Sequence, residues 1–243
     1  MNRFTAYSVM VLAVLMGGGS LLLFGAFLII GPFTIIRFDA SEAQVLVWDG
    51  LLSALFFMQH SGMVRVSFQT WFSSVVPRYY HPAIYAIASG TALTAVVILW
   101  QTSPTVLFQI QGPLQLLPRA FTLLAIAGFV WGVHALREFD PYGVVPIKVR
   151  LRGKELRPPK FVLKGPYLWV RHPLYFFTLV LIWSVPDVKA DRLLLNVLWT
   201  AWLILGAYLE ERDLVAAFGE TYRQYQKTVP MLLPWKGPVG RRV

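Results

Sequence analysis

The sequence predicts an all-α integral membrane protein with about six membrane segments. Of its 243 residues, 56% are hydrophobic and 15% are aromatic, and the mean hydropathy is +0.58. These values lie far from those of a water-soluble domain. Long uncharged stretches recur along the chain, and they match the length that a helix needs to cross a bilayer. We expect four spanning helices, followed by a C-terminal helical hairpin and a cytoplasmic tail helix.

The first span is predicted over residues 8–30, where 23 consecutive residues carry no charge. Arg3 precedes this stretch, as a basic residue precedes the apolar core of a signal peptide. The stretch is longer than such a core and has no obvious small-x-small cleavage site, so we expect a retained helix. The glycines at 17–19 indicate close helix packing, because no strand precedes them as in a nucleotide-binding loop.

Three further spans are predicted over residues 45–60, 83–100 and 120–136. Each of these stretches is apolar and is bounded by polar, proline or charged residues. The loops between them are therefore expected at the two membrane surfaces.

The C-terminal hairpin is predicted to have arms over residues 174–185 and 193–209, with a turn at Pro186-Asp187. At 1.5 Å per residue, the first arm is only about 18 Å long and the second about 25 Å. The first arm is therefore expected to be short, tilted or only partly inserted. In the tail over residues 212–228, apolar and aromatic side chains recur at helical spacing, so we expect the tail to pack against the cytoplasmic mouth.

The organisation that follows is a single membrane domain over residues 1–243. Its parts are a four-helix membrane part (1–136), a basic cytoplasmic connector (137–164), and the hairpin with its tail (165–234).

Basic residues are distributed unequally between the predicted loops. The stretch over residues 137–171 carries nine Lys and Arg residues, and placing it inside puts 18 of the 22 basic residues in the cytoplasm. This asymmetry predicts that both termini are cytoplasmic. Loop topology and attraction to anionic membrane lipid then explain the net charge of +10, and no nucleic-acid partner is expected. The absence of cysteine excludes a cysteine nucleophile and a thiolate metal site.

The start of the hairpin carries the first candidate site. Arg171 and His172 precede Pro173, which suits the first position of a helix because its φ is fixed and its missing N–H is not needed there. The positive end of that helix could hold a carboxylate, with Arg171 as charge partner and with His172 and Tyr175 as hydrogen-bonding or stacking groups. A basic and aromatic anchor at the membrane interface is the alternative.

The end of the hairpin carries two adjacent carboxylates on the same side of the membrane. Glu210 and Glu211 point in different directions on a helix, so only one of them is expected to face a pocket. Taken alone, they also fit helix-end ion pairing. Together with the basic cluster at the hairpin start, they favour a site.

Three ionisable residues elsewhere are weaker candidates. His60 and His134 lie near the ends of the second and fourth spans, where they could ligate haem, or His60 could contact a substrate. A lone histidine near a helix end is more often a satisfied interfacial group, and no spacing here predicts a metal site. Asp49 lies in the outer part of the second span and is a candidate as an ionisable group near lipid, with a water-exposed helix start as the alternative.

The hairpin ends as a whole resemble a known family. The resemblance rests on Gly165-Pro166-Tyr167, Val170-Arg171-His172-Pro173-Leu174-Tyr175, Glu210-Glu211-Arg212-Asp213-Leu214, Phe218-Gly219, Tyr222, Tyr225 and Val229-Pro230. This pattern is similar to that of the isoprenylcysteine carboxyl methyltransferase superfamily, integral membrane enzymes that use S-adenosylmethionine. Residues 59–65 and 231–234 are more similar to its bacterial branch, which contains methanethiol S-methyltransferase and NnrU-like proteins.

The resemblance implies a fold, a location in a bacterial inner membrane, a cofactor and a set of site residues. The residues that it implies for the S-adenosylmethionine pocket are Tyr167, Val170, Arg171, His172, Pro173, Tyr175, and Glu210 or Glu211. It further implies methyl transfer to a small apolar thiol, methanethiol first, giving dimethyl sulfide. In such a reaction Glu211 or His60 could take the thiol proton, and Arg171 would complete the catalytic set.

Two alternatives to the small thiol stay open. One is a methyltransferase for an isoprenyl-type or other lipophilic thiol or carboxylate, and the other is a non-enzymatic haem-binding protein of the NnrU sort that uses His60 and His134. The sequence also departs from the superfamily after Tyr175, where a glycine is common and this chain has Phe176-Phe177. Two bulky aromatic side chains there could narrow the acceptor side.

Overall fold

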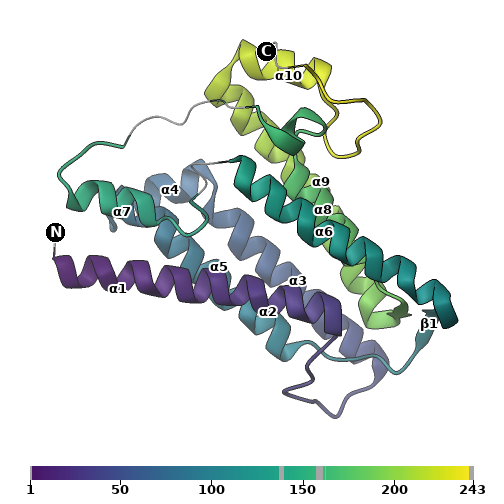
Figure 1. Ribbon diagram of the computed structural model, residues 1–243. Helices are drawn as coiled ribbons and strands as arrows, with labels where there is room; N and C mark the ends of the chain where they lie inside the picture. Colours follow the sequence, from purple (N-terminus) through teal and green to yellow (C-terminus); the bar gives the residue numbers. More distant parts are fainter. Residues whose placement is uncertain (1, 137–139, 157–160, 162, 241–243) are drawn as a thin grey trace. The chain divides into compact units, whose positions relative to one another are not determined.

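The structure is a computed structural model that describes residues 2–136, 140–156, 161 and 163–240. The chain forms two compact units, which are described separately below and coloured by sequence in Figure 1. Unit 1 comprises residues 1–104 and 140–158, and unit 2 comprises residues 105–139 and 159–243. The predicted connector lies partly outside the described residues, at 137–139, 157–160 and 162. The single membrane domain stays a prediction.

Unit 1 is built on three long helices. The first is continuous through a π-helical turn, the second starts with a capping box in which Ser41 and Gln44 exchange hydrogen bonds, and the third has Pro82 in its first turn. The elements are α1 (Arg3–Ala13), η1 (Val14–Gly18), α2 (Gly19–Ile30), α3 (Glu42–Met63), α4 (Val66–Phe72), η2 (Arg78–Tyr80), α5 (His81–Leu99) and α7 (Val144–Leu151).

At the π-helical turn, α5 approaches the first helix closely. A Cβ atom added at Gly90 would lie 2.3 Å from the carbonyl oxygen of Met16 and 2.9 Å from the backbone nitrogen of Gly17. Only a glycine at position 90 allows the two backbones to meet at this distance. Small residues at helix crossings serve the same purpose in membrane proteins generally.

The helix α7 was not predicted, because its residues were assigned to an irregular connector. It follows Gly143, which has φ 64, and the Asp140 carboxylate caps it by accepting from Val144 N at 3.1 Å and from Val145 N at 2.7 Å. Its Ile147 is fully buried in a cluster with small residues of α1 and α5. The cluster's buried residues are Ala6, Met10, Ala13, Ala83, Ala86 and Ile147. Packing therefore holds part of the basic connector against unit 1.

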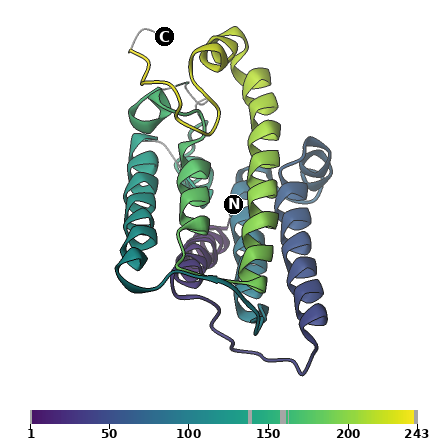
Figure 2. The same ribbon diagram turned by 90° about the vertical axis from the view of Figure 1, so that its right-hand side faces the viewer.

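Unit 2 contains the hairpin, the tail and the preceding helix. Its elements are β1 (Val106–Gln109), η3 (Gly112–Gln115), α6 (Leu116–Ala135), η4 (Gly165–Leu168), α8 (Pro173–Trp183), β2 (Asp187–Lys189), α9 (Ala190–Phe218) and α10 (Glu220–Thr228). The two short strands pair antiparallel, with Val106 opposite Lys189, so the hairpin turn is tied to the segment before α6. Figure 2 shows α6 and α8 running side by side, next to the long α9.

The contact between α6 and α8 is made possible by glycines. A Cβ atom at Gly128 would lie 2.1 Å from the ring of Phe177, and one at Gly132 would lie 2.7 Å from Leu174. Phe177 therefore occupies the space above Gly128 in a helix–helix contact. The aromatic pair after Tyr175 thus contributes the ring of Phe177 to helix packing. The effect of the pair on the acceptor side stays a prediction.

The prediction of an all-α, multi-pass membrane protein is confirmed. Four helical stretches among the described residues are long and apolar enough to cross a membrane, and Pro173–Trp183 forms a shorter apolar helix. The four are Arg3–Ile30, Arg78–Leu99, Gly112–Ala135 and Ala190–Phe218. Helix α3 lies where the second span was predicted, but it is not among the four because its polar residues lower its mean hydropathy. The fourth stretch is instead α9, the second arm of the hairpin.

Asp49 is one of those polar residues, and it is completely buried. Its Oδ1 accepts a hydrogen bond from Gln101 N at 2.9 Å, which satisfies a backbone donor just beyond the end of α5. The expectation of a water-exposed helix start at Asp49 is therefore wrong, and the residue ties α3 to the loop after α5.

Candidate functional site

The two ends of the helical hairpin meet in a buried ion pair. Arg171, in the loop before α8, donates from Nε to Glu211 Oε1 at 2.6 Å and from Nη2 to Glu211 Oε2 at 2.9 Å. The two side chains are only 10% and 9% exposed. This two-point geometry is the strongest form of the arginine–carboxylate contact, and burial protects it from screening by water.

Glu211 is the centre of a larger hydrogen-bond network. Its Oε1 also accepts from His172 Nε2 at 3.0 Å and from the Tyr222 hydroxyl at 2.9 Å, and its Oε2 accepts from Gln226 Nε2 at 2.5 Å. Because a carboxylate only accepts, His172 must carry a proton on Nε2. Both oxygens of Glu211 are then fully used, so this buried charge is compensated within the protein.

Arg171 also holds the segment that follows α10. Its Nη1 donates to the carbonyl oxygens of Gln226 at 3.0 Å and Val229 at 2.5 Å. Four of its five N–H groups are therefore directed at protein acceptors. This geometry favours Arg171 as a positioning residue, and the predicted contact with a cofactor carboxylate stays a prediction.

The backbone before α8 is fixed by the same segment. Arg171 N donates to Pro230 O at 2.9 Å, His172 N donates to Met231 O at 3.1 Å, and the Tyr225 hydroxyl donates to Tyr167 O at 2.5 Å. Residues 226–231, which we call the strap, thus lie along the loop that leads into α8. The strap explains how a loop next to the membrane surface holds two charged or polar side chains in one geometry.

Glu210 differs from its neighbour in exposure. Its side chain is 46% exposed, and its Oε2 lies 3.7 Å from His172 Nδ1. The ring of His172 is stacked on the ring of Tyr175, with centroids 5.5 Å apart and an angle of 13° between the planes. Glu210 also raises the pKa of Tyr167, on top of a larger effect from burial. An accessible carboxylate therefore lies beside His172, which stacks on Tyr175, and near Tyr167.

The remaining predicted pocket residues are buried in the protein interior. Val170 is 2% exposed and Pro173 is buried at the first position of α8. Of the residues predicted from the resemblance, the structure gathers those of the hairpin into one cluster in unit 2. His60 belongs to unit 1, where its Nε2 lies 2.7 Å from the Tyr85 hydroxyl. Its role as a base, and a haem role shared with His134, stay predictions.

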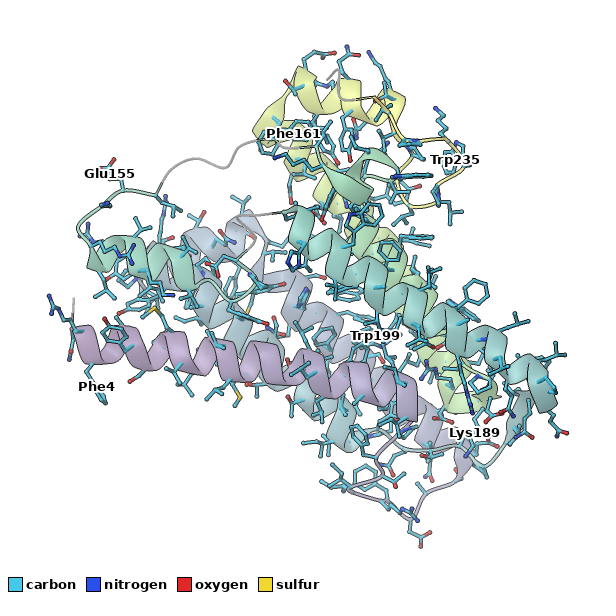
Figure 3. The ribbon with its side chains drawn as sticks, in the orientation of Figure 1. Phe4, Glu155, Phe161, Lys189, Trp199 and Trp235 are labelled. Atoms are coloured by element: carbon cyan, nitrogen blue, oxygen red, sulfur yellow. The ribbon has the colours of Figure 1, made fainter. Side chains whose placement is uncertain are left out.

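Sequence reasoning missed Tyr222 and Gln226 as site residues. Both lie on α10, which starts after a turn at Gly219 with φ 58 and packs through Tyr222, Tyr225 and Val229. Figure 3 labels Phe161, which joins this cluster at the end of unit 2 opposite Lys189. The four-residue spacing between Tyr222 and Gln226 places them on one helix face, and that spacing could have identified them.

Tyr222 acts as a hydrogen-bond donor at neutral pH. Burial raises the pKa of its phenol, and the nearby charge of Glu211 raises it further, while Arg171 lowers it. A raised pKa keeps the proton on the hydroxyl, so the donation to Glu211 persists across the physiological range.

Replacing Tyr222 by phenylalanine is expected to lower the free energy of unfolding by about 1.5–3 kcal/mol, because a buried charge loses one of its donors. Unfolding in mixed micelles with increasing dodecyl sulfate measures this change. Tyr208→Phe is the matched control, since Tyr208 is 59% exposed on α9. Equal stability of the two variants would contradict a role of the hydroxyl in the network.

The fold and this network define a multi-pass membrane protein with a polar site where two hairpin arms end. In a comparison with known proteins, this chain is 34% identical over 206 residues to methanethiol S-methyltransferase 1 of Bradyrhizobium diazoefficiens. The match covers 83% of this chain and 71% of that protein. Methanethiol S-methyltransferase of Mycobacterium tuberculosis is 31% identical over 81% of each chain. Nurim of Mus musculus is 30% identical, over 72% of this chain and 70% of that protein. No family model and no solved structure matches the chain.

The chain therefore belongs to the isoprenylcysteine carboxyl methyltransferase-like family of membrane methyltransferases, in the branch of the methanethiol S-methyltransferases.

Proposed function

We propose that this protein transfers a methyl group from S-adenosylmethionine to the sulfur of methanethiol, which gives dimethyl sulfide. The observation that carries the proposal is the similarity, at 31–36% identity over most of the chain, to relatives named for that reaction. The hairpin cluster in unit 2 supplies the place where the methyl donor would bind.

The residues of this cluster fit a cationic donor. S-adenosylmethionine combines a sulfonium, an ammonium and a carboxylate with a nucleoside, and when bound it supplies an activated methyl group. Glu210 offers an accessible carboxylate for the cationic or hydroxyl groups. The stacked rings of His172 and Tyr175 offer aromatic faces that attract a positive charge. The burial of Glu211 and Arg171 leaves Glu210 as the exposed charge of the set.

Glu211 and Arg171 act in this proposal by positioning. Their ion pair connects α9 to the loop before α8, and the His172 Nε2 contact fixes the orientation of the imidazole ring. The ring's other nitrogen then faces Glu210. A methyl transfer needs alignment more than it needs a nucleophile on the enzyme, because well-oriented reactants gain several kcal/mol, on the order of 7–11, from proximity alone.

The thiol must lose a proton, and the sequence predicts Glu211 or His60 as the base. Glu211 fits this step poorly, because its oxygens accept five hydrogen bonds from four side chains, which leaves no acceptor site for a thiol proton. The role of His60 stays a prediction.

The location proposed for the protein is a bacterial inner membrane with both termini in the cytoplasm. The supporting observation is the excess of basic residues in the loops on one side. A volatile, apolar thiol partitions into lipid and can enter from the membrane, whereas the charged methyl donor enters from the cytoplasm.

The test is headspace gas chromatography of the purified protein in lipid nanodiscs with methanethiol and S-adenosylmethionine. We expect dimethyl sulfide, and we expect Glu210→Gln to raise the KM for S-adenosylmethionine by about tenfold, the effect of losing one charge-assisted contact. Glu220→Gln is the control, because Glu220 is 63% exposed and pairs with Arg223 on α10. A folded protein that binds S-adenosylhomocysteine but forms no dimethyl sulfide would overturn methanethiol as the acceptor.

A further inference from the structure

Helix α7 has two chemically different faces. Its Ile147 is fully buried, and Val144 and Leu151 pack against the same cluster of α1 and α5. Its cationic side chains Lys148 and Arg150 are exposed, and the exposed Arg152 and Lys154 follow directly after the helix. We call these four residues the α7 cations.

The α7 cations outnumber the acidic residues beside them in the sequence. The nearest acidic residues are Asp140, before α7, and Glu155, directly after Lys154. Asp140 itself is used as the cap of α7, since its two oxygens accept from Val144 N and Val145 N. Four cations against two carboxylates leave this segment with a net positive charge, on a helix that packing holds in place.

The position of α7 in unit 1 relates this charge to a membrane surface. The helix packs along α1, beside Ala6, Met10 and Ala13, and against η2 and the first turns of α5. These segments begin two candidate membrane spans, Arg3–Ile30 and Arg78–Leu99. Figure 1 shows α7 alongside the N-terminal part of α1. The α7 cations therefore lie where two spans emerge from the hydrocarbon core, at the depth of the lipid headgroups.

Exposed apolar side chains accompany the cations at this end. Phe4 is 79% exposed at the start of α1, and Val145 is 45% exposed on α7. Figure 3 shows Phe4 at the outer side of the first helical turn. The Arg150 guanidinium lies 6.0 Å from the ring centre of Tyr79, which places it at the edge of the packed surface. Cations beside exposed apolar groups are typical of a surface that meets anionic lipid.

We propose that the α7 cations bind the phosphate headgroups of anionic phospholipids, and that α7 is a preformed anchor of unit 1 on the membrane surface. Charge complementarity determines the partner, because the negative surface potential of an anionic leaflet contributes favourable binding free energy for each cation near it. The buried face distinguishes α7 from an unstructured basic loop, since α7 presents its charges without having to fold first.

Native mass spectrometry of the full chain in nonionic detergent tests this inference. The protein is titrated with phosphatidylglycerol or with phosphatidylcholine, and bound lipids are counted. We expect preferential binding of phosphatidylglycerol, and we expect the variant K148Q/R150Q/R152Q/K154Q to bind it at least tenfold more weakly, with phosphatidylcholine binding unchanged. The matched control is R212Q/R223Q/K227Q/K236Q, which removes the same charge from exposed positions of unit 2.

Two results would overturn the proposal. One is equal loss of phosphatidylglycerol in both quadruple variants, which would mean that only net charge matters. The other is displacement of phosphatidylglycerol by glycerol phosphate at an equal concentration, which would identify a site for a free phosphate. The double variant R152Q/K154Q changes only residues that follow the helix, so it serves as the test if the quadruple variant does not fold. We expect it to bind phosphatidylglycerol at least threefold more weakly than the parent protein. Unchanged phosphatidylglycerol binding would count against the proposal.

Discussion

Replacing Glu211 by glutamine is expected to lower the free energy of unfolding by about 3–5 kcal/mol, the cost of breaking a buried ion pair from one side. The substitution keeps the shape of the side chain but leaves the Arg171 guanidinium buried without its counter-charge. Arg171 also carries the strap, so its displacement would release the contacts to Gln226 O and Val229 O. Unfolding in mixed micelles measures the change, and proteolysis of the strap reports where it occurs.

The neighbouring carboxylate gives the control for this experiment. Glu210→Gln removes the same charge from a side chain that is 46% exposed. Exposed ion pairs contribute about 0–1 kcal/mol, so Glu210→Gln should leave the unfolding transition nearly unchanged. If both variants lost stability equally, the buried network would not be the contact that holds the hairpin ends together.

The second large effect is expected from Gly90→Ala in unit 1. The added methyl group would lie 2.3 Å from the carbonyl oxygen of Met16 and 2.5 Å from its carbonyl carbon, so only backbone atoms could move aside. We expect a loss of about 3 kcal/mol, at the upper end of the range for overpacked cores, because the π-helical turn must shift as a whole. Thermal unfolding followed by size-exclusion chromatography checks the loss.

Gly50→Ala tests the same change without the clash. Gly50 lies inside α3, and a Cβ atom there would meet no other atom within 4 Å. Alanine is favoured over glycine inside a helix by roughly 0.5–1 kcal/mol, so this variant should be slightly more stable than the parent. A melting temperature of Gly90→Ala equal to or above that of Gly50→Ala would refute the close approach of α5 to the first helix.

Hydropathy identified the helices of this protein well and their ends less well. The stretch predicted over 45–60 became α3, Glu42–Met63, because a capping box at Ser41 extends it by a turn. The second hairpin arm, predicted over 193–209, became the 29-residue α9, which is about 43 Å long. Its last turns carry Glu210, Glu211 and other charges, and an apolar window cannot detect a helix that continues into water.

Two elements depend on contacts between distant parts of the chain. The helix α7 has eight residues, too few to be stable alone, and it persists because Ile147 is buried against α1 and α5. The strands β1 and β2 are separated by about eighty residues, and neither shows a distinctive pattern. Sequence periodicity contains no information on such pairings.

For the candidate site, the sequence predicted which residues lie close together but not which of them form the buried network and which stay accessible. The meeting of Arg171 with a glutamate followed from the two arms of one hairpin. The choice of Glu211 over Glu210 depends on the rotation of α9 about its axis, which is set by its packing. The donors Tyr222 and Gln226 depend on the turn at Gly219, where the chain reverses toward the end of α9.

The strap has a consequence for how the protein is made. Residues 226–231 leave the ribosome after α9, so the loop before α8 reaches its final hydrogen-bond partners only once translation has passed the membrane-inserted helices. A chain interrupted after α9 would still insert its hairpin but would have Arg171 and Glu211 without the carbonyls, phenol and amide that complete their surroundings. The polar surroundings of the site are thus completed by a segment that follows the last long helix along the chain.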